Sequence, residues 1–177
     1  MNVTRKIAVG VGALAAATGA TVVASPAQAS NSTPFYSSAG APAGYPQITS
    51  CLDAAAPNGT IGAGTKVEIW QCTGTFNQQW SVWSDHTIRP ANNASLCLDA
   101  NGSTPLHAGT NIQLWPCNGG TNQMWYLYGQ PGTFDQIKNY SGYCLDVNGS
   151  AGVFPNGTGV DLWNCNYGTN QDWSYTN

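Results

Sequence analysis

The chain has 177 residues, with five Lys or Arg against eight Asp or Glu, and its formal net charge at pH 7 is −3. So few cations cannot neutralise a phosphate backbone, which excludes nucleic acid as a partner. The sequence also lacks a basic amphipathic stretch, so we expect no membrane insertion by the mature protein.

The N-terminal segment has the pattern of a secretory signal peptide. Arg5 and Lys6 precede an uncharged, largely apolar run over residues 7–24, and Ala27-Gln28-Ala29 offers a small-x-small cleavage site. A membrane anchor is the alternative, but the run is rich in Gly, Ala and Thr and is weakly apolar for a spanning helix. We predict a signal peptide over residues 1–29 and a secreted, extracellular protein.

The residues after the signal peptide divide into a short leader and one domain. Residues 30–44 are rich in Ser, Ala, Pro and Gly, which predicts a flexible leader. Residues 45–177 are enough chain for one domain with a real core. The part after residue 29 retains three basic residues and all eight acids, a net charge of −5.

One sequence unit occurs three times in this domain, over about residues 45–85, 86–133 and 134–177. Each copy contains, in order, Cys-Leu-Asp, an apolar-x-apolar-Trp-x-Cys segment and Asn-Gln-x-Trp. The first cysteines of successive units are 46 and 47 residues apart, and the second cysteine precedes the Asn-Gln pair by five residues every time. Three matches in register establish an internal repeat.

The cysteines fall only within the repeats. An even number of them in an exported chain indicates disulfides. Among the possible pairings, the repeat selects the one that places the same link in every unit: Cys51–Cys72, Cys97–Cys117 and Cys144–Cys165. No Cys-x-x-Cys pair occurs and neither histidine is near a cysteine cluster, so we expect no metal site and no cofactor.

Short β-prone segments and turn-forming residues alternate through each unit. Residues 67–70 and 112–115 alternate apolar and polar side chains, which predicts strands. Units two and three open with expected strands over 87–89 and 136–138, whereas unit one has Tyr45-Pro46-Gln47-Ile48, where proline cannot donate to a ladder. We predict an all-β fold of short strands, closed into a pseudo-threefold barrel because closure removes exposed sheet edges.

The triplicated Cys-Leu-Asp, apolar-x-apolar-Trp-x-Cys and Asn-Gln-x-Trp set resembles the ricin-B-type lectins, also called Gln-x-Trp lectins or family 13 carbohydrate-binding modules. The resemblance covers about residue 45 to the C-terminus. It implies a β-trefoil of three lobes, each with one disulfide, that binds carbohydrate at up to three shallow, outward-facing sites. Galactose-type sugars and xylose-based glycans are that family's usual ligands. We expect the protein to be a monomer.

The resemblance assigns repeated positions to sugar contact. A carboxylate can accept hydrogen bonds from two neighbouring hydroxyls, although an Asx turn is the alternative role; the carboxylates are Asp53, Asp99 and Asp146. An exposed indole can stack on the C–H face of a sugar, although core packing is the alternative; the indoles are Trp70, Trp115 and Trp163. The second tryptophan of each unit is predicted to fill the core instead: Trp80, Trp125 and Trp173.

Two further positions complete the expected sites. An Asn is expected to contact the sugar while the following Gln orients the aspartate, in the pairs Asn77-Gln78, Asn122-Gln123 and Asn170-Gln171. Two residues before the strand tryptophan, the units differ, with Glu68, Gln113 and Asp161. Unit two has the full family set, so we expect the most competent site there. Units one and three place a second acid near the aspartate, which could raise a pKa or weaken the site.

Two other functions are alternatives to carbohydrate binding. Paired carboxylates suggest a glycoside hydrolase, but unit two lacks the second acid and a shallow site offers no water-excluding pocket. No sequence motif of a hydrolytic triad, zinc protease or phosphate-binding loop occurs. A β-trefoil protease inhibitor would need a rigid protruding loop and no repeated polar site. We therefore predict a lectin without catalytic residues.

Overall fold

The computed structural model describes residues 31–39, 50–56, 58–102, 105–149 and 154–176. The predicted signal peptide and the segment Tyr45-Pro46-Gln47-Ile48 lie outside the described residues. Within the described ranges, no helix is long and apolar enough to cross a membrane.

The described residues form twelve short strands and three single-turn 3-10 helices. Turns rich in Gly and Asn separate them, which keeps each strand to between three and six residues. The elements of the first lobe are β1 (Phe35–Ser37), β2 (Ser50–Ala54), β3 (Val67–Gln71), η1 (Phe76–Gln78) and β4 (Trp80–Val82). Those of the second are β5 (Ile88–Pro90), β6 (Leu96–Ala100), β7 (Ile112–Pro116), η2 (Thr121–Gln123) and β8 (Trp125–Leu127). Those of the third are β9 (Ile137–Asn139), β10 (Cys144–Val147), β11 (Thr158–Trp163), η3 (Thr169–Gln171) and β12 (Trp173–Tyr175).

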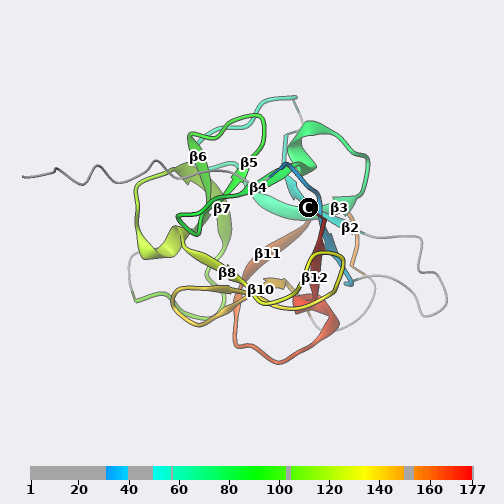
Figure 1. The fold of residues 1–177 in the computed structure, drawn as a ribbon, viewed down its shortest axis with the longest axis vertical. Coiled ribbons are helices and arrows are strands. Elements are labelled where there is room, and N and C mark those ends of the chain that lie inside the picture. The colour runs from blue at the N-terminus through cyan, green and yellow to red at the C-terminus, as the bar shows by residue number, and fades with distance from the viewer. Residues whose placement is uncertain (1–30, 40–49, 57, 103–104, 150–153, 177) are drawn as a thin grey trace, which may run out of the picture.

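The three lobes follow one another around a common centre (Figure 1). In each lobe the two middle strands form an antiparallel hairpin: β2–β3, β6–β7 and β10–β11. The outer strands pair between lobes, β4 with β5 and β8 with β9, and β12 pairs back with β1. The last lobe therefore closes onto the first, and the predicted pseudo-threefold β-trefoil is confirmed.

The predicted flexible leader over residues 30–44 is wrong in part, because it contains the first strand of lobe one. Strand β1 pairs with β12 at the other end of the chain, in the register Phe35↔Tyr175, and also with β2. The Phe35 side chain is fully buried in the core. Without β1 the ring of lobes would lack its closing strand, so the domain begins before residue 45.

The hairpin register separates an inner from an outer face. In β2–β3, Leu52 lies opposite Ile69 and both are fully buried in the core. Side chains alternate between faces along a strand, so the next residue along, Asp53, points to the other face with its ladder partner Glu68. Trp70 lies on that outer face too, because it is two residues from Glu68. The hairpins β6–β7 and β10–β11 repeat this register.

The second tryptophan of each unit fills the core, as predicted. Trp80, Trp125 and Trp173 are at most 1 % exposed, at equivalent positions at the start of the last strand of each lobe. Each indole N–H donates to the carbonyl of the leucine in Cys-Leu-Asp, at 2.9–3.0 Å. The buried ring therefore anchors the backbone immediately before the outer-face aspartate.

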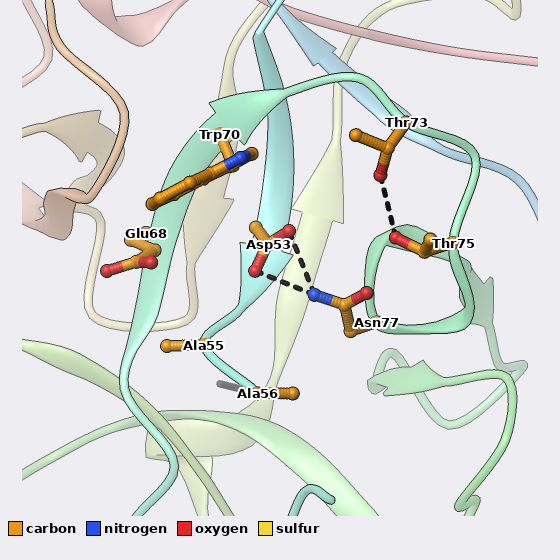
Figure 2. A pocket seen from close by; sticks show the side chains of 8 residues that line it. All are labelled: Asp53, Ala55, Ala56, Glu68, Trp70, Thr73, Thr75 and Asn77. Carbon is orange, nitrogen blue, oxygen red and sulfur yellow. Dashed lines mark hydrogen bonds between the residues drawn. The ribbon is translucent and has the colours of Figure 1, made fainter. Parts of the chain in front are cut away.

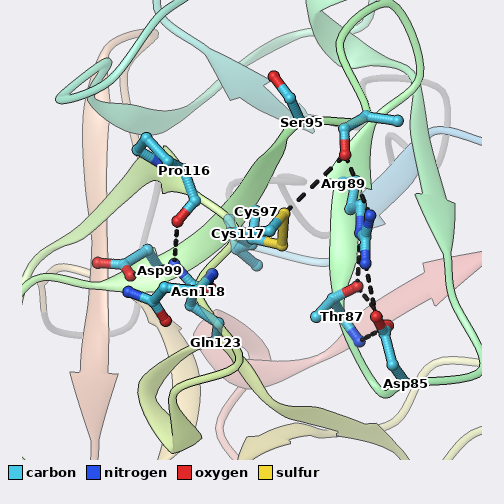
Figure 3. Close-up of a disulfide and its surroundings, with 12 residues drawn as sticks. Asp85, Thr87, Arg89, Ser95, Cys97, Asp99, Pro116, Cys117, Asn118 and Gln123 are labelled. Carbon is cyan, nitrogen blue, oxygen red and sulfur yellow. Dashed lines mark hydrogen bonds and ion pairs between the residues drawn. A yellow bond between two sulfur atoms is a disulfide. The ribbon is translucent and has the colours of Figure 1, made fainter. Parts of the chain in front are cut away.

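One disulfide staples each lobe, with the predicted pairing: Cys51–Cys72, Cys97–Cys117 and Cys144–Cys165. Each bond joins the first hairpin strand to the residue at or just beyond the end of the second. Figure 3 shows the bond of lobe two, close to the segment where Gln123 meets the carbonyl of Pro116. The cross-link therefore holds the end of the hairpin that supports the outer-face site.

Candidate functional site

The outer face of each hairpin carries one copy of the candidate site. Figure 2 shows the copy in lobe one, where Glu68 and Trp70 on β3 lie beside Asp53 on β2 and Asn77 reaches back from η1. These side chains line a hollow of about 320 Å³ together with Ala55, Ala56, Thr73 and Thr75. The structure thus brings together the residues that the sequence assigned to this site.

The aspartate of each site is held by the amide of the asparagine. Asn77 Nδ2 lies 2.9 and 3.0 Å from the two carboxylate oxygens of Asp53. Asn170 Nδ2 makes the same contacts to Asp146, at 2.9 Å each. In lobe two, Asn122 Nδ2 donates to Oδ2 of Asp99 at 2.8 Å. The carboxylates are nearly buried in all three lobes, yet each borders its hollow.

The glutamine after that asparagine is a positioning residue. Gln123 Nε2 donates to Oδ2 of Asp99 at 2.8 Å and to the Pro116 carbonyl at 3.0 Å. Its Oε1 accepts from the backbone N–H of Asn118 at 2.9 Å. Gln78 and Gln171 make equivalent bonds in their lobes. All three glutamines are buried, so they orient the aspartate and cannot themselves reach a ligand.

The strand tryptophans stand on the surface. Trp70, Trp115 and Trp163 are 41 %, 43 % and 45 % exposed, although each follows a fully buried strand residue. Each indole borders the hollow that also holds the aspartate of its lobe. An exposed indole beside a buried carboxylate provides an apolar face and a hydrogen-bond acceptor in one small site.

The residue opposite the aspartate in the ladder differs in its interactions between lobes. In lobe one, Glu68 is paired with Lys66, with Nζ 2.9 Å from Oε2. In lobe two, Gln113 Nε2 donates to Oδ1 of Asp99 at 3.1 Å. In lobe three, Asp161 faces Asp146, and among the described residues its buried Oδ1 has no hydrogen-bond partner.

Burial sets the protonation behaviour of these acids. Desolvation raises the pKa of Asp53, Asp99 and Asp146, and hydrogen bonds from the Asn and Gln side chains partly offset that rise. For Asp161, desolvation and then the charge of Asp146 raise the pKa to about 7, with no hydrogen bond to oppose them. Lobe three therefore holds an acid that changes charge near neutral pH.

Residues at two further positions of the repeat unit, which the sequence did not assign to the sites, line the hollows. The residue after the second cysteine does so in each lobe: Thr73, Asn118 and Asn166. The residue two after the aspartate does so as well: Ala55, Asn101 and Asn148. Both positions can be found by aligning the three units, but neither has the same residue in all three.

Within the described residues, no group of three or more His, Cys, Asp or Glu could hold a metal ion.

The sequence matches the family model of the ricin-type β-trefoil lectin domain over residues 44–151 and 93–177. These overlapping matches span most of the chain, which therefore belongs to the ricin-type β-trefoil lectin family. A search among curated proteins finds no match.

Solved structures share the fold at low sequence identity. The designed threefold-symmetric protein ThreeFoil aligns with a TM-score of 0.64 and 22 % identity, covering 82 % of this chain and 98 % of ThreeFoil. The agglutinin from Abrus precatorius aligns with a TM-score of 0.62 and 20 % identity, over 89 % of this chain and 52 % of the agglutinin, so the chain spans about half of that protein. The β-trefoil lectin of the Vibrio vulnificus hemolysin/cytolysin, solved with N-acetyl-D-lactosamine bound, gives 0.59 and 23 %, over 82 % and 93 %.

Proposed function

We propose that this protein is a secreted lectin that binds carbohydrate without chemical turnover. The observation that carries the proposal is the triplicated pairing of an exposed indole with a carboxylate held by Asn and Gln. A sugar ring can stack its C–H face on Trp115 while two hydroxyls donate to Asp99 and a third meets the amide of Asn122. Membership of the ricin-type lectin family supports the same function.

The geometry also argues against glycoside hydrolysis. A pair of carboxyl groups working as acid and base needs a second acid, and lobe two has Gln113 in that place. In lobe one the second acid, Glu68, is bound to a lysine. Lobe three retains a second acid, because Asp161 faces Asp146, but both side chains are nearly buried. We therefore propose no catalytic residue, and we expect native protein to release no product from xylan, galactan or aryl glycosides. Release that Glu68→Gln or Asp161→Asn abolished would contradict this.

The sugar class is proposed from the family, whose usual ligands are galactose-type sugars and xylose-based glycans. The site bears on the number of rings, because a small hollow beside one indole accommodates about one ring. The Vibrio vulnificus lectin, whose structure contains N-acetyl-D-lactosamine, is a related case. A single shallow site should bind weakly, with a dissociation constant on the order of 1 mM, or about −4 kcal/mol.

Tighter binding would then come from several lobes that bind the same glycan or glycan surface at once. The three hairpins lie around the pseudo-threefold axis, so their sites face different directions and suit a polymer or a crowded glycan surface. Once one site holds a chain, the others meet its remaining sugars at an effective concentration in the millimolar range, which can raise avidity by roughly 100-fold. Equal affinity per sugar for a monosaccharide and its immobilised polymer would contradict this.

A glycan array with matched variants tests the proposed function. The native protein should bind galactose- or xylose-containing glycans. A variant that combines Trp70→Ala, Trp115→Ala and Trp163→Ala should not, while its circular dichroism stays native because these side chains are exposed. Binding that survives in this variant would place the sugar elsewhere. The rival function, protease inhibition through an exposed loop, would give a protein that binds no glycan and blocks a protease.

A further inference from the structure

The outer face of lobe three contains a buried acid with one oxygen that accepts no hydrogen bond from the described residues. Asp161 is 4 % exposed and borders the hollow of about 480 Å³ that also holds Asp146 and Trp163. Among the described residues, its Oδ1 has neither a donor nor contact with solvent. The equivalent position of lobe one carries an ion pair with Lys66, and that of lobe two carries an amide. Lobe three contains neither arrangement.

The charged groups around Asp161 do not supply the missing partner. Asp146 faces it from β10 and carries the same charge. Lys66 and Glu68 lie across the β3–β11 pairing, but the lysine Nζ donates to Glu68 Oε2 and to the Gly157 carbonyl at 2.8 Å. From the segment before β7, His107 is exposed, and its ring nitrogen Nδ1 is bonded to the Ala108 carbonyl. None of the described charged groups around Asp161 neutralises its ionised form.

We propose that the lobe-three site binds sugar with Asp161 protonated, so that this residue determines when lobe three is competent. The inference rests on the proposed carbohydrate-binding function and extends it to one lobe. In its neutral form Asp161 has one O–H donor and one acceptor, as the amide of Gln113 has a donor and an acceptor in lobe two. In its ionised form two buried carboxylates face one another with no cation between them.

Sugar binding should strengthen the preference for the neutral acid. A ring stacked on Trp163 covers the hollow and removes water, and desolvation disfavours the charged form of a carboxylate. The protonated hydroxyl can donate to Asp146 or to a sugar oxygen, whereas a second carboxylate can only accept. Bound sugar should therefore raise the pKa of Asp161 above the value of about 7 that it has in the free protein, and binding should take up a proton.

The sign of the pH dependence follows from this linkage. Affinity at lobe three should be highest where Asp161 is already protonated and should fall as the pH rises through 7. If bound sugar raises the pKa by about one further unit, affinity changes about tenfold between pH 5.5 and pH 8.5. Lobe two has an amide in place of the second acid, so the affinity of its site should change far less over that interval.

The experiment uses the indole N–H signals of Trp163 and Trp115 in one ¹⁵N-labelled sample of the full mature chain. Methyl galactoside and methyl xyloside are titrated at pH 5.5, 7 and 8.5. We expect a tenfold loss of affinity at Trp163 on going to pH 8.5 and little change at Trp115. In Asp161→Asn, the affinity at Trp163 should become independent of pH. The Trp115 signal of the same variant is the control, and it should titrate as in the native protein.

Failure of this inference and failure of the proposed function give different results. If neither indole signal shifts with either sugar at any pH, binding of these sugars is refuted, and the inference with it. If Trp115 responds while Trp163 does not respond, responds equally at all pH values, or responds more strongly at pH 8.5, only the role of Asp161 is overturned. The native pH series alone gives this answer, even if a variant folds poorly.

Discussion

The two tryptophans of each repeat have opposite environments, although they are only ten residues apart in sequence. In lobe two, Trp125 is buried at the centre and its indole N–H is bonded to the Leu98 carbonyl. Trp115 stands on the outer face with nearly half of its surface exposed. The same side chain therefore serves the core in one position and a binding surface in the other.

The two environments show that the inner face of the hairpins stabilises the fold, whereas the outer face is the surface that we propose binds the ligand. The inner face is apolar and fully packed, and it holds the backbone that carries each aspartate. The outer face combines exposed rings with buried acids, which is a costly arrangement for a protein that has no ligand to bind. Changes on the inner face should therefore reduce stability, whereas changes on the outer face should affect binding and can even raise stability.

The largest effect is expected from the inner face. Trp125→Ala should lower the free energy of unfolding by about 4 kcal/mol, because it leaves a cavity and an unbonded carbonyl in the core. Urea unfolding followed by circular dichroism measures the loss. Trp125→Phe, which keeps a ring but not the N–H, should lose less. A loss below about 1 kcal/mol for the alanine variant would show that the core does not depend on this ring.

Removal of a disulfide should have the next largest effect. Replacing both cysteines of the 97–117 bond by serine frees a loop of sequence separation 20, which should cost about 3 kcal/mol through the greater entropy of the unfolded chain. Denaturant melts of this variant and of the equivalent lobe-one variant should agree within about 1 kcal/mol if the lobes are equivalent. A large difference between the two variants would show that the lobes do not contribute equally to stability.

An outer-face change should act in the opposite direction. The pKa of Asp161 is about 7 in the folded protein, against 3.8 for an ordinary aspartate. Between these pH values the native state holds a proton that the unfolded chain has released, so stability falls as the pH rises from about 4 to 7 and stays lower above that. Asp161→Asn should reduce this slope, leaving the part due to the other buried aspartates, and be roughly 2 kcal/mol more stable than native protein at pH 8. Unfolding midpoints of both proteins from pH 4 to 8 measure how stability changes with pH. The same slope in the variant as in the native protein would contradict this prediction.

The smallest effect on stability is expected for the exposed indole. Trp115→Ala should lower the free energy of unfolding by about 1 kcal/mol, less than a core change, because nearly half of the residue is already exposed. The same variant should lose sugar binding at lobe two, measured by titration of the lobe-two Asn122 amide signals. A variant that is strongly destabilised, or that still binds at lobe two, would remove the contrast between the two tryptophans.

Much of the fold and of the candidate site could be predicted from the sequence because the information is local and occurs three times. Cys-Leu-Asp and Asn-Gln-x-Trp in constant order identified the lobes, the disulfides and the residues that meet at each outer face. The threefold repetition also predicted that the second tryptophan of each unit, such as Trp125, fills the core. Short-range spacing was sufficient for these features.

The sequence by itself determined the repeat and the cross-links, because both follow from the constant spacing of the three units, and its resemblance to a lectin family assigned the residues of the three candidate sites. Only the tertiary structure decided that Phe35–Ser37 is a strand, since its partner β12 lies at the far end of the chain. Lys66 and Glu68 are close in sequence, but Lys66 also donates to the Gly157 carbonyl, so its position depends on a contact with lobe three. The missing partner of Asp161 is a property of its packed surroundings. Closure of the ring and the second contact of Lys66 depend on residues far apart in the sequence, which no local pattern encodes.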